Sequence, residues 1–408
     1  MSDRRILYAA AFLRALGTAM VAVLLAIYLA RLEFSVEQIG YVVSAGLWGA
    51  AAASLAATLL ADRRGRRRML LELALLSALG ALAVCVASHR LVMMAASFLG
   101  MLNGMGRDRG AALIVEQAIL PATASDDRRT QTFAVYNVFQ DAGHALGSLL
   151  AGLPSLLAVW TPISETTADR LAIGLYAMLM AMNALLYARL SAAVDVPAGR
   201  ALPPVSRQSK RLLARISALF ALDGLGGGFL TTTLLSYFFF KRFEATEGVV
   251  AVLFFLARVA NALSHLGAAW LAKRIGLVNT MVFTHVPSSL LLVTVAFAPN
   301  FPVAALLFLL REGLVEMDVP TRQSYVMAVV RPEERTVASG VTHVVRLGAW
   351  AAGPSFAGLL MQGVALGIPL VVGAGLKISY DVLLYWAFRR VRPPEEASSH
   401  GDSPSSGR

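Results

Sequence analysis

The sequence predicts an all-α integral membrane protein with twelve transmembrane helices in two pseudo-symmetric six-helix halves. Three observations predict it: an apolar composition, twelve apolar runs of helical length, and segments of the first half that recur in the second. Of the 408 residues, 57% are hydrophobic and 15% are charged, and the mean hydropathy is +0.65. Soluble domains carry about 25% charged residues, so this chain is expected to lie in a lipid bilayer.

Each apolar run is long enough to cross a membrane as a helix. About twenty apolar residues span the hydrocarbon core, because a helix satisfies its own backbone polar groups. The first run is too long for the core of a signal peptide and lacks a small-residue cleavage site, so we interpret it as a retained span. In order, the predicted spans lie near residues 6–30, 40–61, 69–88, 91–120, 131–160, 168–189, 212–240, 248–272, 277–298, 301–330, 336–362 and 367–388.

Basic residues are distributed unevenly between alternate connections, which indicates the orientation. One set of connections holds most of the Lys and Arg, whereas the other holds only Arg31, Arg90, Arg170, Lys241 and Arg242. Because Lys and Arg in short loops stay on the cytoplasmic side, both termini are expected to be cytoplasmic, in the cell inner (cytoplasmic) membrane. The net charge of +11 then reflects topology. No aromatic stacking platform accompanies it, which argues against a nucleic-acid partner.

Matching segments indicate a duplication. The segment "LRALGTAM" from Leu13 matches "LDGLGGGF" from Leu222, which places Arg14 and Asp223 at equivalent depths of the first and seventh spans. Two further matches follow in the same order, as expected for internally repeated membrane folds. The expected organisation is an N-terminal half over 1–190, a cytoplasmic linker over 191–211, a C-terminal half over 212–390 and a disordered cytoplasmic tail over 391–408.

The turn between the second and third spans concentrates charge in the run "LADRRGRR". Gly65 can adopt the positive φ of a tight connection, and Asp62 can accept charge-assisted hydrogen bonds from neighbouring arginines. The run resembles the loop motif G-x-L-x-D-R-x-G-R-[RK] of the major facilitator superfamily of secondary transporters, with Thr58 in place of the first glycine. The resemblance implies a gate formed by Asp62, Gly65 and Arg66 that latches the two halves together. The alternative is a simple positive-inside anchor.

Charged residues inside the predicted spans are the candidates for contact with a solute or a proton. Charges at bilayer depth are costly and usually face partners or a watery cavity. Arginine keeps its proton and suits anion binding, whereas carboxylates are candidate proton carriers. The alternative is structural pairing, for example of Arg14 with Asp223. The candidates for substrate or proton coupling are Arg14, Asp141, Asp223, Arg258, Arg311, Glu312 and Arg346, with Lys377 at similar depth and His144, His265 and His343 as further relays.

Small residues in the fifth and eleventh spans predict close helix packing. The segment "GHALGSLLAG" resembles the superfamily's antiporter motif G-x-x-x-G-P-x-x-G-G, with Ser148 in the proline position, and "AWAAGPSFAG" restores the proline in the eleventh span. The resemblance implies antiport, although the same spacing also occurs in ordinary helix packing. The predicted packing residues are Gly143, Gly147, Gly152, Gly353, Pro354 and Gly358.

No enzyme motif is present in the sequence, so no catalytic residue and no cofactor is predicted. Cys85 is the single cysteine, which provides no metal-binding spacing and no disulfide. The predicted function is a secondary active transporter that works by alternating access, with proton-coupled efflux of small organic solutes. Its expected partners are a small-molecule solute, protons or another coupling ion, and the lipid bilayer. The alternatives are an importer of anionic metabolites, which the midplane arginines favour, and a non-transporting membrane scaffold or sensor.

Overall fold

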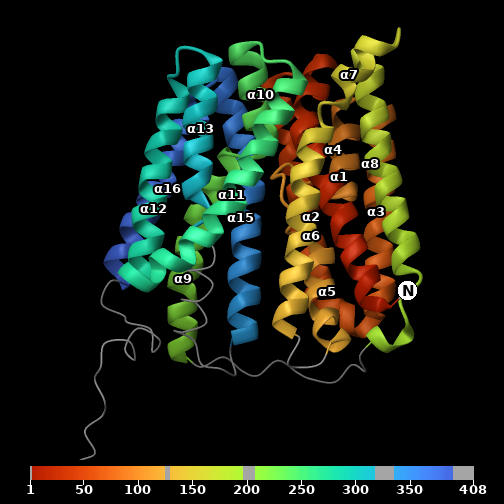
Figure 1. Ribbon diagram of the computed structural model, residues 1–408, viewed down its shortest axis with the longest axis vertical. Helices are drawn as coiled ribbons and strands as arrows, with labels where there is room; N and C mark the ends of the chain where they lie inside the picture. Colours follow the sequence, from red (N-terminus) through yellow and green to blue (C-terminus); the bar gives the residue numbers. More distant parts are fainter. Residues whose placement is uncertain (1, 125–128, 196–206, 318–334, 389–408) are drawn as a thin grey trace, which may run out of the picture.

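Two helical bundles stand side by side, one from each half of the chain (Figure 1). The computed structural model describes residues 2–124, 129–195, 207–317 and 335–388. The N-terminal half contains α1 (Asp3–Arg31), α2 (Val36–Arg64), α3 (Arg66–Val86), α4 (Arg90–Gly100), α5 (Ala111–Ile119), η1 (Leu120–Thr123), α6 (Arg129–Leu150), α7 (Leu153–Trp160) and α8 (Glu165–Tyr187), followed by η3 (Ala192–Val194). The C-terminal half contains α9 (Arg207–Phe229), α10 (Thr232–Phe243), α11 (Glu247–Ile275), α12 (Leu277–Ala296), α13 (Phe301–Val315), α15 (Arg335–Gly363) and α16 (Ile368–Phe388).

The helices form twelve spans, which confirms the predicted fold class. Among the described residues, ten helical segments are long and apolar enough to cross a membrane. Two of these segments each join consecutive helices, α6 with α7 and α9 with α10. The fourth span consists of α4 and α5, and α13 begins the tenth.

The predicted boundary between the halves falls partly outside the described residues. Residues 196–206 of the linker and the whole predicted tail, 391–408, lie outside them. α9 begins at Arg207, before the predicted end of the linker. Polar residues with good helix propensity extend this helix beyond its apolar part, which is the only part that hydropathy detects.

The prediction of one continuous helix over 91–120 is wrong. α4 and α5 are separated by an irregular segment, residues 101–110, in which Gly106 has a φ of 72°. The side-chain amide of Asn103 donates to the carbonyl of Arg107 at 2.6 Å and so holds the segment in a turn. Hydropathy averages over a whole window, and therefore it misses a local hydrogen bond of this kind.

The predicted span over 212–240 is also interrupted. Three consecutive glycines, 226–228, come just before the break between α9 and α10, and glycine weakens a helix. The side chain of Thr231 then caps α10 by accepting from the N–H of Leu234 at 3.2 Å. The seventh span is therefore two helices with a polar joint.

Glycines allow equivalent close contacts in both halves. Gly143 and Gly147 of α6 lie against the backbone of α1, and a Cβ at Gly143 would lie 2.6 Å from the carbonyl oxygen of Phe12. In the C-terminal half, a Cβ at Gly353 of α15 would lie 2.5 Å from the Cα of Gly228 on α9. The first helix of each half is thus packed against the fifth span of the same half.

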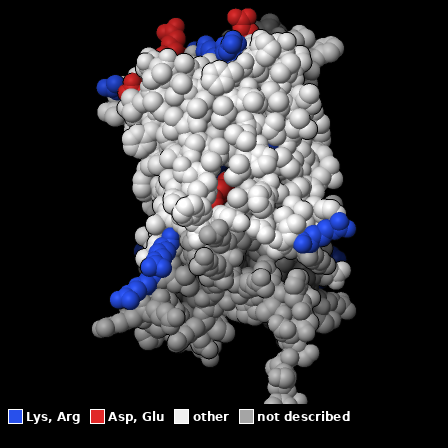
Figure 2. Space-filling view, turned by 90° about the vertical axis from the view of Figure 1, so that its left-hand side faces the viewer, with Lys and Arg blue, Asp and Glu red and all other residues white. Residues whose placement is uncertain are grey.

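Other small residues lie where the two halves meet. A Cβ built on Gly40 of α2 would meet the carbonyl oxygen of Pro354 on α15 and would lie 3.1 Å from the Cα of Gly358. A Cβ on Gly152 would lie 3.2 Å from the Cα of Gly248 on α11. On the face that Figure 2 shows, a broad band without Lys, Arg, Asp or Glu lies between charged ends, apart from a small acidic patch. A band without charged side chains suits contact with lipid.

We predict that Gly147→Ala lowers the stability of the N-terminal half. The new methyl group would meet the backbone of Leu16, and overpacking of this kind costs about 1–3 kcal/mol. The expected result is a lower apparent Tm in detergent. Gly174→Ala is the matched control, because nothing lies within 4 Å of a Cβ at that position on α8. Equal melting of the two variants would contradict the packing argument.

Candidate functional site

The two helix breaks meet near the centre of the molecule. The backbone N–H of Thr233 donates to the carbonyl of Gly104 at 3.1 Å, and the hydroxyl of Thr233 lies 2.7 Å from the carbonyl of Ala22 and 3.1 Å from that of Gly104. The hydroxyl of Thr232 donates to the carbonyl of Met105 at 2.9 Å. Backbone polar groups in a membrane need protein partners. Here donors at the break in the seventh span bind carbonyls that the break in the fourth span leaves free. This junction joins the fourth span to the seventh across the two halves.

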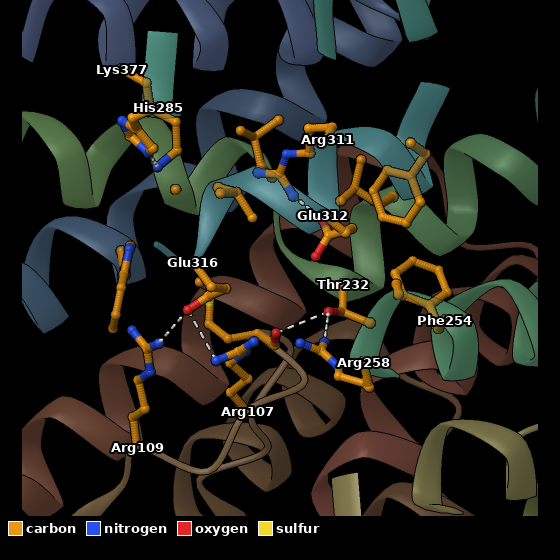
Figure 3. A pocket seen from close by; sticks show the side chains of 18 of the residues that line it. Arg107, Arg109, Thr232, Phe254, Arg258, His285, Arg311, Glu312, Glu316 and Lys377 are labelled. Atoms are coloured by element: carbon orange, nitrogen blue, oxygen red, sulfur yellow. Dashed lines mark hydrogen bonds and ion pairs between the residues drawn. The ribbon is translucent and has the colours of Figure 1, made fainter. Parts of the chain in front are cut away.

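A central cavity of about 100 Å³ lies beside this junction. Its walls come from both halves, and Figure 3 shows charged side chains from each converging on it. Phe254, Phe308 and Trp350 supply apolar surface. The charged lining consists of Arg107, Arg109, Arg258, Arg311, Arg346, Lys377, Glu312 and Glu316. A polar cavity at the joint of discontinuous helices is typical of a solute site.

Arg107 and Arg109 reach from the N-terminal half to Glu316 at the end of α13 (Figure 3). Arg107 donates to Glu316 Oε2 at 3.1 Å, and Arg109 Nη2 lies 3.7 Å from the same oxygen. Arg107 also donates to Asn261 Oδ1 at 2.6 Å, and Asn261 donates in turn to Glu312 Oε2 at 2.7 Å. The irregular segment is thereby tied to α11 and α13 of the other half.

Among the described residues, Arg258 of α11 has only neutral hydrogen-bond acceptors. It donates to Thr232 Oγ1 at 3.0 Å and to Asn261 Oδ1 at 3.5 Å, and its Nε has no hydrogen-bond partner. Within the described part of the chain, no carboxylate forms an ion pair with Arg258, whereas Arg311 pairs with Glu312 beside it. An unbalanced charge in a protein interior is costly, so the cavity is complementary to an anion.

A chain of polar contacts leads from the cavity into the C-terminal half. Asp223 of α9 accepts from Arg346 Nη2 at 2.6 Å and from Lys377 Nζ at 3.0 Å. Lys377 Nζ lies 3.4 Å from His285 Nε2, and His285 Nδ1 lies 2.9 Å from Asp381 Oδ2. Asp223 and Asp381 are fully buried. Their burial is tolerated because cationic or imidazole groups face both carboxylates.

Arg14 of α1 is the centre of a second network, in the N-terminal half. Its guanidinium forms a bidentate pair with Glu116 at 2.6 and 2.9 Å, and its Nε donates to Asp108 Oδ2 at 2.5 Å. The hydroxyls of Tyr136 and Tyr187 donate to Glu116 at 2.6 and 2.7 Å. This network therefore contains one guanidinium and two carboxylates, all of them buried.

Arg31 joins the halves at the other end of α1. It pairs with Asp169 at 2.7 Å and Glu165 at 2.9 Å, both on α8, and with Glu247 on α11. Ser155 of α7 donates to Glu247 at 2.9 Å. Asp169 and Glu247 are buried, whereas Glu165 is exposed. The cluster is therefore a largely dry bridge between the two bundles.

The predicted gate lies at the end of the molecule that also carries the N-terminus. Arg66 Nε donates to Asp62 Oδ1 at 2.7 Å, and Gly65 between them has a φ of 92°. Arg66 also donates to the carbonyl of Ala118 at 3.1 Å. These contacts all lie within the N-terminal half, and the side chain of Asp62 is 60% exposed.

The suggested pairing of Arg14 with Asp223 is wrong. Each is bound by residues of its own half: Arg14 by Asp108 and Glu116, and Asp223 by cations on α15 and α16. Positions equivalent by duplication belong to different bundles, and each bundle supplies the counterions for its own buried charge.

The remaining candidates have varied positions. Asp141 is exposed on α6 and does not line the central cavity. His144 Nε2 accepts from the backbone N–H of Asp108 at 2.8 Å, and His343 Nε2 is buried with no hydrogen-bond partner among the described residues. The side chain of His265 lies outside what the structure describes.

In the described parts of the chain, no group of three or more His, Cys, Asp or Glu residues could hold a metal ion.

The set of residues predicted from the sequence omits Glu116, His285 and Asp381. All three lie within predicted apolar spans. The rule that ionisable groups at bilayer depth are functional candidates therefore applies to them as it does to Arg14. What the sequence lacks is any sign of which charges meet.

We predict that Glu247→Ala loosens the bridge at Arg31 and favours separation of the halves at that end. Removing one member of a buried ion pair costs about 3–5 kcal/mol. The measurement is the distance distribution between spin labels at Thr161→Cys and Lys241→Cys in a Cys85→Ser background. Glu165→Ala is the matched control, because this partner of Arg31 is exposed and exposed pairs contribute about 0–1 kcal/mol. An equal response of both variants would rule out the bridge.

Comparison with known proteins agrees with the resemblance found in the sequence. The family model described as Major Facilitator Superfamily matches residues 7–354. An uncharacterized membrane protein, YJR124C, from Saccharomyces cerevisiae (strain ATCC 204508 / S288c) is 23% identical over 420 residues, which cover 95% of this chain and 94% of that protein.

Solved structures share the fold at low sequence identity. The nucleoside transporter NupG superposes with a TM-score of 0.75 at 15% identity, covering 95% of this chain and 100% of that one. The D-xylose-proton symporter superposes with a TM-score of 0.72 at 13% identity, covering 94% and 96%. At these identities the likeness concerns the fold alone.

Proposed function

We propose that this chain, which belongs to the Major Facilitator Superfamily, carries a small organic anion across the membrane by alternating access. Its family and fold are those of multi-pass membrane proteins that carry out secondary transport. The choice of an anion rests on Arg258 and the charge of the central cavity. Six cationic side chains line that cavity together with two carboxylates, and Asp223 and Asp381 lie behind them. The described residues therefore leave it net positive.

The proposed binding mode follows from the position of Arg258. An anionic group of the solute would supply the charge that Arg258 lacks and would displace its weak contact with Asn261, 3.5 Å long. Phe254 and Phe308, which contact each other with ring centroids 5.6 Å apart, would pack against an apolar part of the solute. A carboxylate or phosphate ester on a small organic body has this combination of properties.

We predict that organic anions stabilise the purified protein and that this effect depends on Arg258. A thermal-shift panel would contain monocarboxylates, dicarboxylates and phosphate monoesters, with neutral sugars for comparison. At least one anion should raise the apparent Tm, Arg258→Gln should abolish the shift, and Arg258→Lys should retain part of it. Stabilisation by neutral solutes alone would refute the choice of an anion.

Proton-coupled export is the proposed direction and energy source. The glycine pattern around Gly143 and Gly147 supports antiport, and the buried carboxylates of both networks are available to carry protons. The basic ends of α2 and α3 support a cytoplasmic position for both termini, in the cell inner membrane.

The alternative, an importer of anionic metabolites, would use the same cavity. Flux of an identified anion in vesicles of known orientation, with and without a protonophore, separates the two directions and excludes a scaffold.

We predict that Asp62→Asn slows transport without affecting membrane insertion. In the proposed cycle, Asp62 and Arg66 join the halves once the opposite end opens, and the variant would weaken that latch. The measurement is the initial rate of anion flux in proteoliposomes, with a reduction of about tenfold expected for about 1.4 kcal/mol. Glu72→Gln is the matched control, because Glu72 forms a similar pair with Arg68 one turn further along. An unchanged rate in Asp62→Asn would discard the gate.

A further inference from the structure

An apolar groove runs along the outside of the C-terminal half, between α11 and α13. Its volume is about 340 Å³. The lining includes Val249, Val252 and Leu256 of α11 and Phe301, Ala305 and Leu309 of α13. These residues recur about once per turn on each helix, so the groove follows the helix axes for about 12 Å. It shares no lining residue with the central cavity.

Small residues keep this groove open. Gly248 of α11 also lines it, and a Cβ at that position would have nothing within 4 Å. Opposite, on α13, Ala305 contributes a single methyl group. The walls are apolar and reach the surface, where the side chain of Val252 is 46% exposed. A concave apolar surface at this depth of a bilayer is complementary to an acyl chain.

A guanidinium lies close to one end of the groove. Phe301 contacts Phe243, the last residue of α10, with ring centroids 6.3 Å apart. Arg242 Cζ lies 5.5 Å from the centroid of the Phe243 ring. Lys241 comes next to it in sequence, and both cations are exposed. Among the described residues, their charged groups contact aromatic rings and form no ion pair with a carboxylate.

This end of the groove lies where the helices leave the membrane. α10 ends at Phe243 and α13 begins at Phe301, at the end of the molecule opposite the N-terminus (Figure 1). Arg242 is therefore placed at the depth of the lipid headgroups, and the groove leads from it towards the middle of the bilayer. Glu244 is exposed in the same turn, but the two neighbouring cations outweigh it.

We propose that this groove binds an anionic phospholipid. One acyl chain lies between α11 and α13, and the headgroup phosphate accepts from Arg242, with Lys241 beside it. Arginine suits this role because its planar guanidinium offers several donors to a phosphate. The site uses neither the central cavity nor a transported solute, so it is independent of the proposed transport function.

The test compares two phospholipids that differ only in the headgroup. Delipidated protein in detergent is titrated with phosphatidylglycerol or with phosphatidylcholine of the same acyl chains, and bound lipid is measured by native mass spectrometry. Phosphatidylglycerol should bind more tightly and raise the apparent Tm further. Arg242→Gln should weaken its binding about fivefold and leave phosphatidylcholine binding unchanged. Arg90→Gln is the matched control, because Arg90 is exposed and does not line the groove.

A second variant fills the groove. The side chain in Gly248→Leu would enter open space, so the lipid-free protein should melt no lower than the wild type, whereas both phospholipids should bind more weakly. Gly174→Leu is the control, because its position on α8 is equally open. Equal affinity of the wild type for both phospholipids, or a preference that survives either groove variant, would overturn the proposal. Wild-type dimers that Gly248→Leu abolishes would also overturn it, because a second copy would then occupy the groove.

Discussion

The cost of placing a charge at the middle of a membrane governs this structure. Each half has an ionisable residue on its first helix, Arg14 in one and Asp223 in the other, at positions related by the internal repeat. Each is buried and each has acquired two partners of opposite sign. The duplicated scaffold thus holds one buried guanidinium that faces two carboxylates and one buried carboxylate that faces two cations.

The helix breaks place these networks within reach of each other. A continuous fourth span would bury its backbone groups internally and offer nothing to its neighbour. The irregular segment instead exposes carbonyls that Thr232 and Thr233 satisfy, and it turns three consecutive charged residues in different directions. Asp108 faces its own half, while its two neighbours face the other. The break that hydropathy fails to detect is therefore what connects the central cavity to the N-terminal network.

Contacts between the halves differ along the length of the molecule. Glycine contacts between α2 and α15 and the dry bridge at Arg31 join the bundles at one end. The charged turn at Asp62 makes its described contacts inside its own half. The buried bridge at Arg31 therefore has to be broken before that end can open, whereas the pair of Asp62 and Arg66 does not join the halves in this conformation. A rocking motion of two rigid bundles exchanges contacts at one end for contacts at the other.

Hydropathy and the expense of intramembrane charge are local properties, so they reveal the number of spans, their repeat and several of the buried charges, among them Arg14 and Asp223. The sequence also indicated the sharp turn at Gly65. The folded arrangement alone places Arg14 against Glu116 rather than Asp223, and it extends the other network through His285 and Asp381. These partners lie far apart in sequence, on helices whose rotation and depth depend on packing throughout the bundle. No local pattern encodes which charge a guanidinium will face.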